Sequence, residues 1–300
     1  MTAGQHGRPG TLYVVATPIG NLEDISYRAV RLLGEVDLIA AEDTRHSRKL
    51  LNHYSIATPL ISCHEHNEER RSSELLDRLQ RGEDVALISD AGTPCIADPG
   101  YRLVTACWQA GLRVVPIPGA SALTTVLSVA GLPTDRFAFE GYLPARAQAR
   151  RRLLEALRTE SRTLVMHETP HRLRKALDDI VEIMGAERPL VVGRELTKRH
   201  EELFRGTAGA AREHFAEGVI RGEIVLVLAA GAAPPRVGMT QALAERLADP
   251  DCPRSEAVRL IAREYGVPRS EVYRASLDLD AGANPADFNA EPRGRGENLS

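Results

Sequence analysis

Aromatic side chains are scarce in this chain of 300 residues, where Phe, Trp and Tyr together make up 4%. So low a content argues against an RNA-binding module built on a series of aromatic platforms. The net charge is −3, so any nucleic-acid site must be a local patch of cations rather than a basic face of the whole molecule. Four cysteines, Cys63, Cys95, Cys107 and Cys252, form no Cys-x-x-Cys pair, which predicts free thiols in a reducing compartment.

Long apolar runs are missing too. None is long enough to span a bilayer, and residues 1–10 are polar and rich in glycine. Because those residues lack the apolar core of a secretory signal, we expect a cytoplasmic protein. With 43% hydrophobic residues, the chain is long enough for a sizeable core and about two domains.

Several cofactor motifs are absent. The chain has no G-x-G-x-x-G, no G-x-x-x-x-G-K-[ST], no H-E-x-x-H and no G-x-S-x-G. These absences disfavour a Rossmann dinucleotide site, a P-loop, a zinc protease site and a serine-hydrolase elbow. His64 and His66 follow Cys63, but without a second pair of ligands we interpret them as loop histidines and expect no metal.

Short apolar runs alternate with helical patterns in the first half of the chain. The predicted strands are 12–16, 36–41, 59–63, 85–88 and 113–117. The predicted helices between and after them include 25–33, 67–80 and 121–130. This alternation predicts a mostly parallel sheet covered on both faces, with ligands bound beyond the carboxyl ends of its strands.

The segment 87–100, LISDAGTPCIADPG, is the clearest candidate for such a ligand-binding edge. A buried strand leads into small and turn-forming residues, among which Gly92 is free to adopt a positive φ. We expect Asp98 to cap the following helix and Pro99 to occupy its first turn. The alternative is an ordinary loop between a strand and a helix, with no ligand.

The second half of the chain has a different pattern of predicted strands and helices. Its pattern indicates a mixed sheet with a basic helix at 150–157 and predicted strands at 137–143, 163–166, 190–192, 202–206 and 223–229. Three short helices follow at 240–247, 254–265 and 268–279. The expected organisation is a disordered arm at 1–10, α/β domains at 11–133 and 134–232, a helical unit at 238–280 and a disordered tail at 281–300.

Seven motifs occur in order: ATPIGNLEDI from 16, AEDTR from 41, HEHNE from 64, SDAGTPCIADPG from 89, PGASAL from 118, ETPHRL from 168 and RELTKRHEE from 194. Over about 11–280 the chain resembles the tetrapyrrole-methylase superfamily of S-adenosylmethionine-dependent enzymes, and more closely the ribosomal RNA small subunit methyltransferase I family. The resemblance implies two α/β domains with the donor cleft between them, a homodimer, and 2′-O-methylation of a cytidine ribose in the decoding centre of 16S rRNA.

The same resemblance implies which residues contact S-adenosylmethionine. They are Ile19, Gly20, Ala91, Gly92, Thr93, Ile96, Ser121, Ala122 and Glu168. The chain departs from the family pattern at Cys95 and Ala97, where Gly and Ser are more usual. Because cysteine is larger than glycine, Cys95 is expected to narrow the cavity.

A ribose hydroxyl is a weak nucleophile until its proton leaves, so we expect a general base or a polarising cation near the site. The candidates follow predicted strands: Glu42, Asp43, His64, Glu65, His66 and Lys198. The choice among them stays open. For Asp43 the alternative role is a helix cap paired with Arg45, and for Lys198 it is a solvated ion pair with Glu195.

The expected RNA contacts are Arg45, Arg172 and Arg199, within basic clusters that also include Arg48 and Lys49 and the run Arg150 to Arg152. Each cluster taken alone is more typical of a solvated face than of an RNA contact. Two other functions remain open on sequence grounds. One is a methyltransferase acting on a tetrapyrrole or another small molecule, and the other is a non-catalytic RNA-binding assembly factor.

Overall fold

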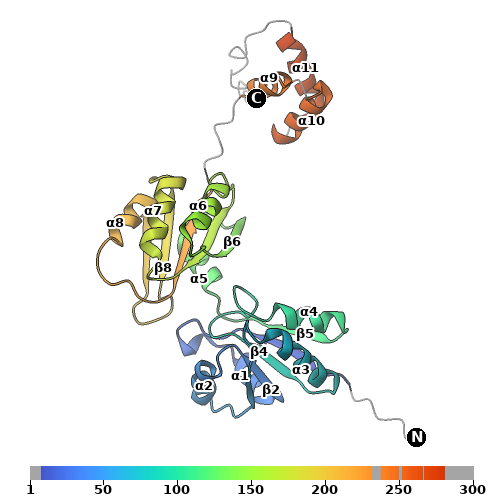
Figure 1. Cartoon of the computed structure of the whole chain (residues 1–300), viewed down its shortest axis with the longest axis vertical. Coiled ribbons are helices and arrows are strands. Elements are labelled where there is room, and N and C mark those ends of the chain that lie inside the picture. The colour runs from blue at the N-terminus through green and yellow to red at the C-terminus, as the bar shows by residue number, and fades with distance from the viewer. Residues whose placement is uncertain (1–7, 232–237, 250–251, 266, 281–300) are drawn as a thin grey trace, which may run out of the picture. The chain divides into compact units, whose positions relative to one another are not determined.

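The computed structural model describes residues 8–231, 238–249, 252–265 and 267–280 (Figure 1). The described residues up to 231 form one compact unit with two five-stranded sheets, and those from 238 to 280 form a second, helical unit. The α/β fold class with a helical C-terminal part is therefore confirmed. The expected tail at 281–300 and most of the expected arm lie outside the described residues, and the domain boundaries stay predictions.

The first sheet is parallel throughout, in the order β3-β2-β4-β1-β5. Its strands are β1 Thr11–Val15, β2 Leu38–Ala41, β3 Leu60–Ser62, β4 Val85–Ile88 and β5 Arg113–Ile117. The central strands read as continuous apolar runs because helices cover both faces. In β4, Val85 and Leu87 pack on one side and Ala86 and Ile88 on the other.

Two pairs of helices provide this cover. The helices α1 Tyr27–Glu35 and α2 Thr44–His53 contribute Leu33 and Leu51 to one apolar cluster. The helices α3 Glu68–Gln80 and α4 Tyr101–Gln109 contribute Leu75 and Leu103 to the cluster on the opposite face. A short 3-10 turn, Leu22–Asp24, precedes α1.

The second sheet is mixed, in the order β6-β7-β10-β8-β9, and β6 and β7 form its parallel pair. Its strands are β6 Phe137–Tyr142, β7 Thr163–Glu168, β8 Pro189–Arg194, β9 Glu202–Thr207 and β10 Ile224–Leu228. The helices α6 Ala147–Ala156, α7 Leu173–Met184 and α8 Ala208–His214 cover one face. These strands confirm the mixed sheet that the sequence predicts.

The other face of the second sheet is covered by a helix that follows the first sheet. Helix α5, Ala122–Ala130, places Val126 and Leu127 against Val165 and Val225 of the second sheet. Ile19, from the loop after β1, belongs to the same apolar cluster. The two sheets are therefore joined through one shared core, with the loop after β1 inside it.

Helix α4 begins later than the sequence suggested, so the expected cap at Asp98 is wrong. The helix starts at Tyr101, and Gly100 occupies the N-cap position with a φ of +127° and no side chain to offer. The cap comes instead from Glu68 of α3, whose Oε1 accepts the backbone N–H groups of Gly100 and Arg102 at 2.9 and 3.1 Å. A carboxylate at a helix N-terminus satisfies orphan donors and interacts favourably with the helix dipole.

The C-terminal unit consists of α9 Met239–Leu247, α10 Arg254–Tyr265 and α11 Arg269–Asp280. Leu243, Ile261 and Val272 are fully buried at its centre, which confirms the three predicted helices. Within the part of the chain that the structure describes, none of the helices has the length and apolar character needed to cross a membrane.

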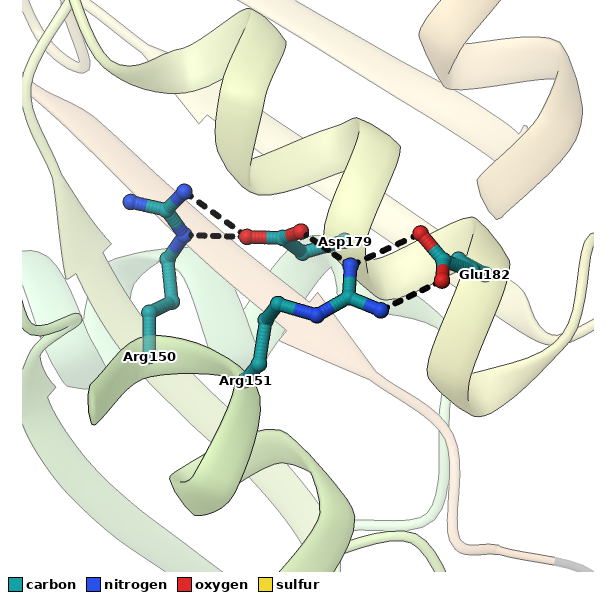
Figure 2. A network of polar contacts seen from close by, with 4 residues as sticks. All are labelled: Arg150, Arg151, Asp179 and Glu182. Atoms are coloured by element: carbon teal, nitrogen blue, oxygen red, sulfur yellow. Dashed lines mark hydrogen bonds and ion pairs between the residues drawn. The ribbon is translucent and has the colours of Figure 1, made fainter. Parts of the chain in front are cut away.

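Helices α6 and α7 are tied together by a polar network (Figure 2). Arg150 is buried, and its Nε donates to Asp179 Oδ2 at 2.8 Å. Arg151 donates to the other oxygen of Asp179 at 2.8 Å and also pairs with Glu182. The helical period of α6 turns Arg150 inward, so it is not available for the RNA contact expected of that basic run.

We expect Asp179→Ala to lower the free energy of unfolding by about 3 kcal/mol, because the buried Arg150 guanidinium loses its counterion. Glu182→Ala, whose side chain is 64% exposed, removes only the solvated part of the network and should cost less than about 1 kcal/mol. Urea unfolding of both variants measures the difference. An equal loss in the two variants would contradict a buried ion pair centred on Asp179.

Candidate functional site

A cavity of about 230 Å³ lies where the carboxyl ends of the first sheet's strands face the second sheet. Because all five strands of the first sheet run parallel, the loops that follow them emerge at one edge. The loops after β1, β2, β4 and β5 each contribute to the cavity wall, as do the ends of β6, β7 and β10. The sequence-based expectation that distant loops gather at one cleft is met in this arrangement.

Seven of the nine expected donor contacts line this cavity. They are Ile19, Ala91, Gly92, Thr93, Ile96, Ser121 and Ala122. The remaining two lie elsewhere. Gly20 packs beneath Lys198, where a Cβ atom would come within 2.3 Å of the lysine Cγ. Glu168 is buried behind the wall, with its Oε1 2.6 Å from Arg172 Nη2.

The small-residue loop after β4 is fastened to the loop after β1. The N–H of Thr17 donates to the carbonyl of Gly92 at 2.8 Å, and the N–H of Gly92 donates back at 3.0 Å. Gly92 has a φ of +82°, as its sequence context suggested. Cys95 and Ala97 also adopt positive φ, at +69° and +63°, which is unfavourable for residues with a Cβ and is held in place by the surrounding structure.

Carboxylates gather on the cavity wall. Glu42, Asp90, Asp98 and Glu223 all line it. Burial, followed by the charge of Asp90, raises the pKa of Glu42. Burial, followed by the charge of Glu42, raises the pKa of Asp98 to about 6. Side chains that repel one another in this way favour a positively charged ligand, which would relieve the repulsion.

Asp43, an expected catalytic residue, is a structural cap. Its side chain accepts the backbone N–H of Arg45 at 2.8 Å at the start of α2, and the two side chains pair at 2.9 Å. The Arg45 side chain holds the pKa of Asp43 well below its usual range. The alternative role considered for Asp43, a cap with a surface ion pair, describes its geometry.

The residues of the HEHNE segment lie in two different surroundings, one near the cavity carboxylates and one in a separate depression. His64 lies close enough to Glu42 for its charge to lower the pKa of that carboxyl group. Its Nε2 is 3.1 Å from Asn67 Nδ2, and its buried Nδ1 has no hydrogen-bond partner. Glu65 and His66 instead line a separate surface depression beside Arg102. The structure therefore brings His64, but not its two neighbours, to the cavity carboxylates.

Lys198 is engaged in ion pairs. Its Nζ is 2.9 Å from Glu195 Oε1 and 3.4 Å from Glu223 Oε2. Glu195 and Thr197 both have positive φ, at +52° and +66°, so the loop has an uncommon backbone as it crosses Gly20. Lys198 thus links the loop after β1 to Glu223, a carboxylate of the cavity wall. This geometry lets Lys198 hold the two segments in position.

The three expected RNA contacts differ in their surroundings. Arg45 lines a groove along α2 together with Arg48 and Lys49, and this groove begins two residues after Glu42. Arg199 is exposed. The guanidinium of Arg172 is committed to Glu168 and to the hydroxyl of Thr169, to which its Nε donates at 2.9 Å.

Residues that the sequence analysis did not select also line the cavity. Asp90 and Asp98 lie inside the 87–100 segment, where their carboxylates were a visible signal. Tyr142, His167 and Glu223 come from the second sheet, where β7 ends opposite the start of β10. The antiparallel pairing of β7 with β10 brings His167 and Glu223 to one edge, and the parallel pairing of β6 with β7 adds Tyr142. Apolar periodicity reveals neither pairing.

We expect Asp98→Asn to stabilise the protein without ligand at about pH 8, by about 1–2 kcal/mol. Because the pKa of Asp98 is raised in the folded state, folding favours the protonated carboxyl group over the ionised one. The protein is therefore more stable at low pH, and this extra stability is lost as the pH rises through about 6. The gain should vanish toward about pH 4, where Asp98 is protonated in the wild type. Denaturant unfolding at both pH values, with exposed Asp77→Asn as control, measures it. A gain of equal size at both would contradict the electrostatic origin.

Comparison with known proteins agrees with this architecture. A family model described as Tetrapyrrole (Corrin/Porphyrin) Methylases matches residues 11–212. A protein of Synechocystis sp. named Ribosomal RNA small subunit methyltransferase I is 49% identical over 279 residues, which cover 91% of this chain and 99% of that protein. Its namesake in Thermotoga maritima is 51% identical over 219 residues, covering 73% of this chain and 98% of that protein.

Solved structures with low sequence identity share the fold. A diphthine synthase has a TM-score of 0.59 at 16% identity, covering 73% of this chain and 90% of its own. A uroporphyrin-III C-methyl transferase from Thermus thermophilus, complexed with S-adenyl homocysteine, has a TM-score of 0.53 at 18% identity, covering 73% and 97%. With the two sheets, the shared core and the motif order, these matches lead to one conclusion: the chain belongs to the ribosomal RNA small subunit methyltransferase I family of the tetrapyrrole methylases.

Proposed function

We propose that this protein transfers a methyl group from S-adenosylmethionine to the ribose 2′-oxygen of a cytidine in the decoding centre of 16S rRNA. The observation that carries the proposal is the cavity itself, which joins small residues after β4 to a group of carboxylates. Its support from relatives is the 49% identity to proteins named Ribosomal RNA small subunit methyltransferase I. A homodimer, which the family resemblance implies, and a cytoplasmic location, which the sequence pattern predicts, are part of the proposal.

S-adenosylmethionine is the methyl donor of this family, and the residues present fit it. Ala91 and Gly92 let a ligand approach the backbone closely, since neither has a large side chain. Asp98, on the same cavity wall, provides negative charge that suits a sulfonium or an ammonium group. When bound, the donor supplies an electrophilic methyl group. The protein holds it and the acceptor oxygen in line, which is how such a displacement gains most of its rate.

The acceptor hydroxyl must lose its proton as the bond to carbon forms. Among the expected bases, Glu42 lines the cavity and has a raised pKa, which makes it a stronger proton acceptor than a solvated carboxylate. His64 is close to it and has a ring nitrogen without a partner. We infer that Glu42 accepts the proton and that the nearby His64 ring takes it up in turn. Asp43 and Lys198 are occupied elsewhere.

Binding of rRNA needs cations near the cavity mouth, because phosphate contacts position a nucleic acid while the site selects the nucleotide. The groove lined by Arg45, Arg48 and Lys49 supplies them on α2, which begins two residues after Glu42. Arg199 adds an exposed cation three residues before β9. Arg172 instead holds Glu168 behind the cavity wall.

The deciding experiment is transfer of labelled methyl groups from S-adenosylmethionine to small ribosomal subunits that lack their modifications. We expect one labelled cytidine in the decoding centre, resistant to alkaline cleavage because a 2′-O-methyl group removes the attacking hydroxyl. Label on a base, without alkaline resistance, would refute the 2′-oxygen as acceptor. Donor binding without transfer to subunits or free rRNA would favour a small-molecule methyltransferase or a non-catalytic assembly factor. Absence of donor binding would refute the cavity as the donor site.

Glu42→Gln and His64→Ala test the proposed proton path. Each should lower kcat by about 100-fold or more, since general-base catalysis contributes at least that much, while the donor Kd stays within about threefold. Glu65→Gln, in the neighbouring depression, is the matched control and should leave kcat unchanged. Unaltered turnover in both cavity variants would rule out this path.

A further inference from the structure

An aromatic cluster forms part of the cavity wall contributed by the second sheet. The rings of Tyr142 and His167 lie 5.2 Å apart between centroids, tilted by 36°. Behind them, Phe139 meets His167 edge-on at 5.2 Å. Tyr142 and His167 both line the cavity, and Tyr142 is 51% exposed. Tyr142 thus places a half-exposed aromatic ring, packed on His167, at the cavity of a chain that has few aromatic residues.

A β-bulge brings this face into position. In the regular part of the β6–β7 ladder, Phe139 is paired with Val165, so continued pairing would place Gly141 opposite His167. One extra residue shifts the register, and Tyr142 is paired with His167 instead. Gly141, with a φ of +66°, adopts the left-handed conformation at this point. The bulge turns Tyr142 onto the same side of the sheet as Phe139 and His167.

The chemistry of the surface suits a nucleobase. Burial lowers the pKa of His167, which favours the neutral form of its ring. Tyr142 lies within electrostatic range of Asp98 and Glu223, whose charges help to raise its pKa after burial. A flat, neutral ring beside carboxylates is an arrangement that stacks a base while leaving its sugar near proton acceptors.

Resting on the proposed function, we propose that Tyr142, supported by His167, is the stacking site for the target pyrimidine base and holds its ribose at the cavity carboxylates. Two nucleobases take part in the reaction, the donor's adenine and the target. The small residues at Ala91 and Gly92 on the opposite wall suit the donor. A base in folded RNA must leave its neighbours to expose its ribose to an enclosed site, and an aromatic partner replaces the stacking it loses.

The test compares Tyr142→Ala, Tyr142→Phe and Tyr27→Ala in the full-length protein. Tyr27, 97% exposed at the start of α1, is the matched control for loss of a tyrosine. For Tyr142→Ala we expect kcat/KM for small ribosomal subunits to fall about 10- to 100-fold, and the Kd of S-adenosylmethionine without RNA to change less than about twofold. Tyr142→Phe should keep activity within about threefold, because it retains the ring.

The outcomes separate this inference from the function on which it rests. Weaker donor binding in Tyr142→Ala, with transfer recovered at saturating donor, would place the adenine on the ring and overturn the inference. Wild-type kcat/KM in Tyr142→Ala would overturn it as well, and would leave the proposed function intact. A wild-type protein that methylates no rRNA would instead refute the proposed function, and this inference with it.

Discussion

The apolar cluster between helix α5 and the second sheet is the contact on which the site depends. Val126 and Leu127 pack on Val165 and Val225, and Ile19 enters the same cluster from the loop after β1. Since the cavity is walled by loops of one sheet and strand ends of the other, its shape exists only while this core holds them together. Apolar burial of this kind is non-directional, so the fine alignment comes from hydrogen bonds such as those between Thr17 and Gly92.

The cavity also concentrates features that are unfavourable to folding. Glu42 and Asp98 repel each other at reduced solvation, and Cys95 and Ala97 have positive φ. The rest of the protein offsets these costs through continuous apolar strands and through buried ion pairs such as that of Arg150 and Asp179. A natural protein accepts local conflicts of this kind where a ligand or a reaction requires them. Carboxylates facing a cavity are understood most simply as half of an interaction whose cationic partner is the ligand.

Prediction from sequence succeeded where a local pattern determined the outcome. The strands Val85–Ile88 and Arg113–Ile117 and the helix Arg254–Tyr265 have the bounds that their apolar patterns predict. It failed where a distant group replaced a local one: Asp98 was the natural cap for α4, but Glu68 of α3 caps it, and the carboxylate of Asp98 faces the cavity. Likewise, Arg150 looked like part of an RNA-binding run until α7 supplied Asp179 as its partner.

The sequence by itself determined the fold class, the family and many of the residues that line the cavity, because apolar runs, turn residues and ordered motifs are local properties of the chain. Tertiary structure alone decided which candidates meet. It united Glu42, His64 and Asp98, set Glu65 and His66 apart, and brought Tyr142 to the wall through a bulge. The physical reason is that pairing register and helix packing act between segments far apart in sequence, and a shift of one residue reverses the face on which a side chain lies.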